Sequence, residues 1–297
     1  MTTPVPSTII RHLYRAHEHD LGGGFVVRRL LPGHPQQGVG PFLFFDHFGP
    51  TTIAAGQNVD VRPHPHIGLA TVTYLFEGAM LHRDHLGTVQ RIEPGAVNWM
   101  LAGRGIVHSE RVPDDLRGRA WTSHGLQLWV ALPQAHEEDA PSFHHAAAHE
   151  LPETVQGAVR LRVLLGRAFG LAAPVPVLSP LAYAHAQWQH RGAWAVAPEY
   201  TERAVYPVRG ALAVGGTALQ VGQMALLQPG QGVEVEAEAG TEAVLIAGEP
   251  LDGPRFIHWN FASGRRERIE QARADWAAER FPTIAGDDLE RIPLPAR

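Results

Sequence analysis

The sequence predicts an all-β protein made of two tandem β-barrels, with one helix near its C-terminal end. Two observations carry this prediction. The apolar runs are short and are interrupted by turn-forming residues, since the 297-residue chain contains 31 Gly and 24 Pro. Motifs in the first half of the chain also recur, in the same order, in the second half. Many short strands favour a sandwich or a barrel, and the repeat indicates that the unit occurs twice.

The expected strands are short runs of aliphatic, β-branched or aromatic residues bounded by Gly, Pro or Asp. This composition suits the pleated, half-buried surface of a sheet. The clearest runs are residues 70–76, 126–130, 161–165, 193–196 and 243–246.

The internal repeat rests on two pairs of motifs. The segment YLFEGA at 74–79 resembles YPVRGA at 206–211, and AGRGI at 102–106 resembles PGQGV at 229–233. Glycines between these motifs also have partners in the second copy, so order and spacing are kept with one small gap.

The repeat sets the expected domain boundaries. We predict an N-terminal barrel over residues 1–135 and a C-terminal barrel over residues 159–297. The stretch between them, residues 136–158, is polar and contains proline, which is typical of a linker. The terminal helix is expected within the C-terminal domain. Ile269, Ala272 and Trp276 fall on one helical face there, and Ser263 is placed to cap its start.

Composition excludes several classes of function. The net charge of −5 and the pI near 6.4 argue against direct binding to nucleic acid or to an anionic membrane. The absence of cysteine excludes disulfides and thiolate metal ligands. The N-terminal residues lack the pattern of a signal peptide, and no apolar run approaches the roughly 18 residues that span a bilayer. We therefore expect a soluble, cytoplasmic protein.

Two short histidine motifs predict a mononuclear metal site. His64 and His66 flank a proline just before a strong strand, and His108 and Glu110 have the same spacing after a glycine-flanked turn. In an extended segment, residues i and i+2 point to the same side, so each pair can converge on one ion. Three imidazoles and a carboxylate suit Fe(II), Mn(II), Ni(II) or Cu(II), and leave one or two coordination positions for substrate and oxygen.

The second repeat serves as an internal comparison. Aligned on the shared motifs, the four predicted ligands fall on Val196, Pro198, Val235 and Ala237. None of these side chains is a metal ligand, so the C-terminal barrel is predicted to be free of metal.

Several segments resemble the pirin family, a group of two-barrel proteins in the cupin superfamily. The resemblance covers nearly the whole chain and is densest over residues 41–133. The similar segments are PFLFFDHFGP (41–50), RPHPHIGLATVTYLFEG (62–78), HRDHLG (82–87), EPGAVNWMLAGRGIVHSE (93–110), HGLQLWVALP (124–133) and NFASGRRERIEQARADW (260–276). The sequence departs from the family at Ile67, where many pirins have Arg, and at Ala70, where some have Glu.

The resemblance implies two tandem cupin (jelly-roll) barrels and a metal held by His64, His66, His108 and Glu110. It also implies quercetin 2,3-dioxygenase activity, known in several members, and a transcription-cofactor role, known in eukaryotic ones. We expect oxidative ring cleavage of a quercetin-like flavonol by O2, with Glu110 as ligand and catalytic base. Fe(II) is the expected ion, with Mn, Ni, Cu and Zn as alternatives.

The residues around the site are assigned by their place on the expected strands and turns. The predicted substrate pocket consists of Phe44, Phe45, Trp99, Met100 and Gln127. The predicted hydrogen-bond partners around the ligands are Asp46, His82, Asp84 and His85, for which ordinary turn chemistry is an equal interpretation.

Two other functions stay open. A redox-sensing regulatory protein would use the metal to control a surface for a protein partner, without turnover. A cupin isomerase acting on a sugar phosphate would need a cluster of Lys and Arg near the metal. The chain has no lysine, and Arg104 is the only basic residue within the second ligand segment, so the isomerase is the less favoured of the two.

Overall fold

The structure is a computed structural model that describes residues 9–20 and 25–295. The chain divides into two compact units that differ from simple halves of the sequence. Unit 1 holds the residues up to His17, Arg28–Leu43 and His149–Pro250. Unit 2 holds Glu18–Val27, Phe44–Ala148 and the residues from Leu251 onward.

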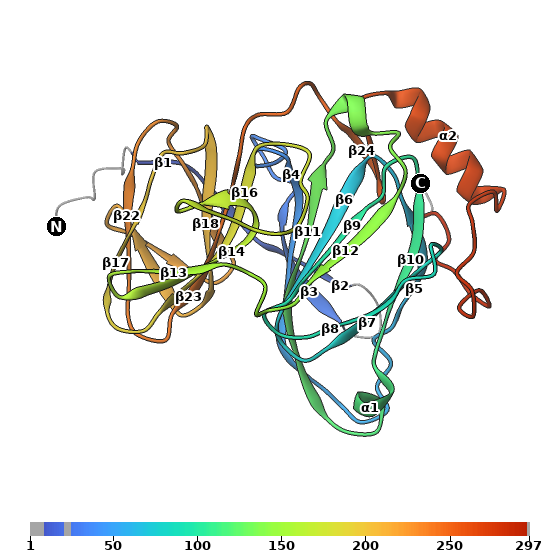
Figure 1. Cartoon of the computed structure of the whole chain (residues 1–297), viewed down its shortest axis with the longest axis horizontal. Helices are drawn as coiled ribbons and strands as arrows, with labels where there is room; N and C mark the ends of the chain where they lie inside the picture. Colours follow the sequence, from blue (N-terminus) through green and yellow to red (C-terminus); the bar gives the residue numbers. More distant parts are fainter. Residues whose placement is uncertain (1–8, 21–24, 296–297) are drawn as a thin grey trace. The chain divides into compact units, whose positions relative to one another are not determined.

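Two antiparallel sheets form a barrel from strands that belong mainly to unit 2 (Figure 1). The larger sheet has seven strands in the order β12-β9-β6-β11-β4-β3-β2, and the smaller has four in the order β5-β10-β7-β8. In the larger sheet the bounds are β12 Ser142–Ala146, β9 Val97–Leu101, β6 Leu69–Glu77, β11 Trp121–Ala131, β4 Phe42–Ile53, β3 Val26–Leu31 and β2 His17–Asp20. In the smaller sheet they are β5 Val61–His66, β10 Ile106–Arg111, β7 Met80–Asp84 and β8 Val89–Ile92.

Unit 1 has a similar pair of sheets. Its larger sheet has the order β1-β21-β18-β23-β16-β14-β13, with β15 paired to β14, and its smaller sheet has the order β17-β22-β19-β20. The bounds are β1 Ile10–Arg15, β13 Glu153–Gln156, β14 Val159–Ala168, β15 Leu171–Ala172, β16 Leu181–Trp188, β17 Gly192–Val196, β18 Glu202–Arg209, β19 Ala211–Val214, β20 Thr217–Gln220, β21 Gln223–Leu227, β22 Val233–Ala237 and β23 Glu242–Gly248.

The predicted architecture is confirmed: the protein is mostly β, with two barrels and one short helix near its C-terminal end. Each predicted strand lies within an observed one, in β6, β11, β14, β17 and β23. In unit 1, Val196 and Val235 are buried in an apolar core with Trp188 and Trp194. Apolar side chains thus occupy two of the positions that align with the predicted metal ligands.

The stretch 136–158 is not a free linker. Strand β12 within it pairs with β9 in unit 2, and β13 pairs with β14 in unit 1. Both strands lie at the edge of a sheet and expose many of their side chains, so their composition resembles that of a loop. The short helices α1 (Asp114–Arg117) and η1 (Gln134–His136) lie in the connections of unit 2.

The terminal helix is observed as α2 (Arg266–Ala277), but it belongs to unit 2 and not to the C-terminal barrel. Its apolar face packs against Ile67 and Val107 and beside the hairpin of β24 (Phe256–His258) and β25 (Phe261–Ser263) (Figure 1). The predicted cap is also wrong: Arg265 is the N-cap residue, while the Ser263 hydroxyl donates to Glu137 over 2.7 Å. Over the described residues, neither α1 nor α2 combines the length and apolarity that a membrane crossing needs.

Replacing Trp276 tests how α2 is attached. Trp276 is buried, and its Nε1 donates to the carbonyl of Ile292 over 3.0 Å. Trp276→Ala should lower the free energy of unfolding of unit 2 by about 3–5 kcal/mol, measured by chemical denaturation. Leu289→Ala is the matched control, because Leu289 is fully exposed and its loss should change stability by less than about 0.5 kcal/mol. Equal stability of the two variants would contradict the packing described.

Candidate metal centre

Three histidines converge from two neighbouring strands. His64 and His66 lie on β5, and His108 lies on β10 directly opposite His64 in the antiparallel register. Because alternate residues of a strand point to one side, all three imidazoles share a face. One nitrogen from each ring lies within 4.8 Å of the other two, and all three residues are buried. The structure therefore brings together three of the four predicted ligands in a group that could hold a metal ion.

Backbone carbonyls fix which nitrogen of the first two rings is free. Nδ1 of His64 lies 2.8 Å from the carbonyl oxygen of Arg62, and Nδ1 of His66 lies 3.2 Å from that of Asn260. A carbonyl oxygen only accepts, so both Nδ1 atoms carry the proton. The Nε2 lone pairs of His64 and His66 are left for an ion, which is the usual arrangement of metal-bound histidine.

A chain of side chains fixes the third ring. Asp84 Oδ2 accepts from His82 Nε2 over 3.0 Å, so His82 presents its Nδ1 lone pair. That atom lies 3.4 Å from His108 Nδ1, which therefore donates. The remaining nitrogen, His108 Nε2, is buried and has no hydrogen-bond partner. Since a buried polar atom rarely stays unsatisfied, the residues fit a metal ion at this point.

The protonation states of the three histidines also favour metal binding. Burial lowers the pKa of His64 to about 4, although the hydrogen bond to Arg62 opposes this shift. Burial likewise lowers the pKa of His66 and of His108 well below the ordinary value. Burial raises the pKa of Asp84, but hydrogen bonds from His82 and Thr88 outweigh it and the net shift is downward. At neutral pH the three rings are thus neutral, as metal binding requires, and Asp84 is an ionised acceptor.

Glu110, the fourth predicted ligand, does not belong to the three-histidine group in the structure. The register between β10 and β5 shifts between His108 and Glu110, so that Glu110 lies opposite Val61. Its Oε1 atom lies 3.6 Å from His108 Nδ1. Burial raises the pKa of the Glu110 carboxyl to about 8, against the lowering effect of Arg111. Glu110 stays a predicted ligand, placed next to the cluster.

One face of the larger sheet lies over the histidines. The Trp129 ring meets His66 edge-on, with 5.4 Å between ring centroids, and the Phe143 ring stacks on His82 at 4.4 Å. Thr71 and Met100 lie between Trp129 and Phe143 in the strand register, so the four residues form one row across the sheet.

The structure separates the five predicted pocket residues. Phe44 stacks on Trp129 at 4.0 Å, and Met100 and Gln127 belong to rows on the same face. Phe45 and Trp99 are buried on the opposite face, because neighbouring residues of a strand point to opposite sides. Phe45 and Trp99 therefore do not share a wall with Phe44 and Met100.

The four predicted hydrogen-bond partners also differ in their positions. His82 lies next to His108, and Asp84 reaches His108 through His82. His85 accepts from the backbone N–H of Val107 over 3.1 Å, which ties the turn after β7 to β10. Asp46 is buried in β4, on the same side as Phe44.

Three residues at the site escaped the sequence interpretation. Trp129 lies two residues beyond Gln127 on a predicted strand, so alternation could have identified it. Phe143 falls in the stretch that we expected to be a linker. Asn260 acts through its backbone carbonyl, and no sequence signal marks such a contact.

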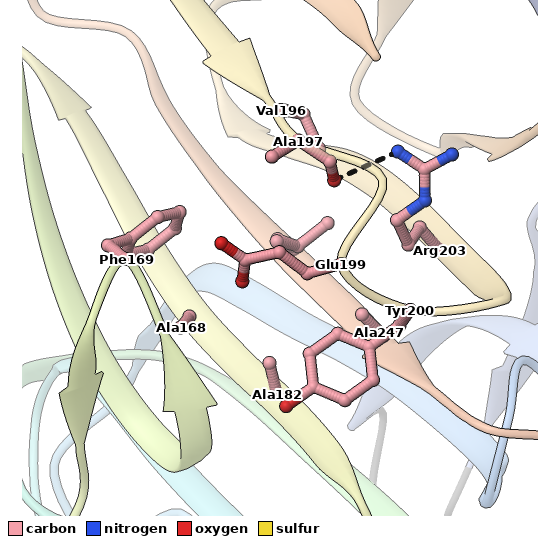
Figure 2. Close-up of a pocket in the computed structure, with 10 residues that line it drawn as sticks. Ala168, Phe169, Ala182, Val196, Ala197, Glu199, Tyr200, Arg203 and Ala247 are labelled. Atoms are coloured by element: carbon pink, nitrogen blue, oxygen red, sulfur yellow. Dashed lines mark hydrogen bonds between the residues drawn. The ribbon is translucent and has the colours of Figure 1, made fainter. Parts of the chain in front are cut away.

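A cavity in unit 1 is too small to be an alternative site. It measures about 10 Å³, which holds about one water molecule. Figure 2 shows Phe169, Glu199 and Tyr200 around it, with Arg203 donating to the carbonyl of Ala197 over 3.1 Å. A flat aromatic substrate therefore does not fit in this cavity.

Proton release on metal binding tests the place of Glu110. With a pKa raised to about 8, the carboxyl is protonated at pH 7 and must lose its proton to bind an ion. The neutral histidines release none. Calorimetry in two buffers of different ionisation enthalpy should detect about one proton released per ion at pH 7. Affinity should rise with pH up to about 8 and then level off. Glu110→Gln should remove both effects; their absence in the wild type would exclude Glu110 as a ligand.

Comparison with known proteins identifies the family. A model of the Pirin family matches residues 24–130, and a model of the Pirin C-terminal cupin domain matches residues 183–282. A pirin-like protein of Caulobacter vibrioides is 47% identical over 286 residues, covering 95% of this chain and 98% of the relative. A Pseudomonas aeruginosa protein, named as a candidate quercetin 2,3-dioxygenase, is 34% identical over 288 residues. The match covers 94% of this chain and 89% of the relative. A crystal structure of quercetin 2,3-dioxygenase from Acinetobacter baumannii matches with a TM-score of 0.90 at 33% identity, covering 96% of this chain and 95% of that one. The chain belongs to the pirin family.

Proposed function

We propose that this protein is a mononuclear metal-dependent dioxygenase that cleaves the ring of a quercetin-like flavonol with O2. The observation that carries the proposal is the convergence of three buried, neutral imidazoles, one of which has an Nε2 atom without any other partner. The Pseudomonas aeruginosa relative, named as a candidate quercetin 2,3-dioxygenase, and the Acinetobacter baumannii structure of a quercetin 2,3-dioxygenase support the choice of reaction.

His64, His66 and His108 would hold the ion through Nε2, and Glu110 would complete the set. Nitrogen and oxygen donors without thiolate suit Fe(II), our proposed ion, and also Mn, Ni, Cu and Zn. When bound, a redox-active ion supplies Lewis acidity toward a substrate hydroxyl and electron exchange with O2.

Glu110 is proposed as the catalytic base. Burial raises the pKa of its carboxyl to about 8, so its ionised form is a stronger base than an ordinary glutamate. It lies two residues beyond His108 on β10, at the edge of the histidine group. In the proposed reaction the Glu110 carboxylate takes the proton of the flavonol hydroxyl and holds it at an Oε atom.

The pair formed by His82 and Asp84 positions His108. The Asp84 carboxylate fixes the tautomer of His82, which in turn accepts from His108 Nδ1 and so directs its Nε2 toward the ion. Such hydrogen bonds also raise the basicity of a ligand imidazole.

The row over the site forms, together with Phe44, an apolar wall beside the histidines. Phe44 and Trp129 stack on each other, and Met100 and Phe143 extend the apolar face. Gln127, bonded to Thr73 over 2.8 Å, lies in the next row and provides polar atoms. Apolar walls with few polar groups are typical of small-molecule sites, which supports a small aromatic substrate.

The deep burial of the histidines favours a second candidate function. Their exposed fractions are 6% for His64, 2% for His66 and 1% for His108, so a dioxygenase requires substrate access to side chains that are almost fully covered in the structure. A regulatory protein, in which the state of the metal changes a surface for a protein partner, has no such requirement.

Turnover of quercetin separates the two functions. The protein is loaded without oxygen with Fe(II), Mn(II), Ni(II) or Cu(II), and then mixed with quercetin and O2. Loss of the flavonol absorbance together with release of carbon monoxide is the expected result, and His108→Ala should abolish it. Stable metal binding without turnover for any of the four ions would contradict the dioxygenase and favour the regulatory protein.

Removing the acceptor at Asp84 tests the positioning of His108. Asp84→Asn should lower metal affinity by about 10- to 100-fold, measured by competition with a chelator, because His82 loses the partner that fixes its tautomer. Asp115→Asn is the control, since this exposed carboxylate pairs with Arg91 and Arg119 on the surface. Unchanged affinity in Asp84→Asn would mean that the pair of His82 and Asp84 does not act on the metal site.

A further inference from the structure

The C-terminal part of the chain supports the metal-ligand strands from behind. On β10, Ser109 and Arg111 alternate with His108 and Glu110, so their side chains point away from the histidine group. The Ser109 hydroxyl donates to Asp287 Oδ2 over 2.6 Å, and Arg111 Nε donates to the same oxygen over 3.0 Å. Asp287 is thus bonded to both neighbours of Glu110.

The same part of the chain also contacts β5. The backbone N–H of Ile292 donates to the carbonyl of Pro63 over 2.8 Å, immediately before His64. The carbonyl of Asn260 accepts from His66. Both strands that carry the predicted ligands are therefore held by residues more than a hundred positions further along the chain.

The C-terminal residues that contact β5 and β10 are in turn bonded to α2 or packed against it. Trp276 Nε1 donates to the carbonyl of Ile292, and Arg291 donates to the carbonyl of Trp276 over 2.8 Å. Ile284 packs in the same apolar cluster as Ile67 and Val107, residues that adjoin two of the histidines. The segment that carries Asp287 is therefore attached to a packed helix at both ends.

The register of β10 shows why Asp287 matters at this point. The ladder with β5 is regular from Ile106 to His108 and then shifts before Glu110. Backbone pairing with β5 consequently does not fix the spacing between His108 and Glu110, and only the other edge of β10 is regular there, where it pairs with β7 from His108 to Arg111. Asp287 bonds the side chains on either side of Glu110, at the irregular part of the ladder.

We propose that Asp287 is a positioning residue of the metal site, which sets the place of the Glu110 carboxylate relative to the three histidines by holding Ser109 and Arg111. This inference rests on the proposed metal site and not on the identity of the substrate. Asp287 touches no ion and no substrate, and acts only through the strand.

Cobalt binding distinguishes a role in positioning Glu110 from a role in stabilising the fold alone. Wild type, Asp287→Ala, Asp287→Asn and Ser109→Ala are loaded with Co(II), whose visible spectrum reports the number and geometry of its ligands. The rate of ion loss to a chelator and the melting temperature of the metal-free protein are also measured. Glu279→Gln is the matched control, because Glu279 pairs with Arg291 near α2 but does not bond to β10.

The proposal predicts about tenfold faster ion loss and shifted Co(II) bands for Asp287→Ala, with smaller changes in the same direction for Asp287→Asn and Ser109→Ala. Glu279→Gln should match the wild type. Ser109→Ala removes a single hydrogen bond, so it keeps the test decisive where Asp287→Ala does not fold. A lower melting temperature with unchanged spectrum and ion loss in the variants would overturn the proposal.

The outcome is separable from that of the proposed function. A wild type that binds no Co(II) would overturn the metal site and this inference together. A wild type that binds Co(II) but never turns over quercetin would leave the dioxygenase contradicted, while the variants still decide the role of Asp287.

Discussion

The antiparallel pairing of β5 with β10 is the constraint on which the site depends. It sets His108 opposite His64, and strand alternation then brings His66 to the same face. A shift of one residue in this pairing would turn the imidazoles away from one another. The barrel around the pair supplies what the register alone does not: burial that keeps the rings neutral, and acceptors that hold each Nδ1 proton away from the site.

The two units show that the barrel does not need the predicted metal ligands. In unit 1, Val196 and Val235 fill the space with apolar side chains and pack beside Trp188 and Trp194. In unit 2, buried histidines stand at the sequence positions that align with these two valines, and they leave one nitrogen unsatisfied within the described residues. Polar groups of this kind cost stability, so their presence in one barrel is best understood as the requirement of a function placed on a shared fold.

Sequence patterns predicted the features that depend on residues close together in the chain. The i, i+2 spacing of His64 and His66, the short strands and the apolar face of α2 all depend on nearby residues, and each is found where expected. Which unit α2 joins is decided by its contacts with Ile67 and Val107, which lie far away in the sequence. The periodicity of the helix carries no information about such distant contacts. Asn260 and Phe143 reach the site in the same long-range way. Phe45 and Trp99 are a different case, because strand alternation applied consistently would have placed them apart from Phe44 and Met100.

X-ray absorption spectroscopy of the iron-loaded protein is the most direct measurement of the proposed coordination. Three imidazole nitrogens and one carboxylate oxygen should surround the ion, and His64→Ala and His108→Ala should each lose one imidazole or fail to hold the ion. A spectrum with no imidazole ligands, or one that stays the same in both variants, would contradict the assignment of the metal to this pair of strands.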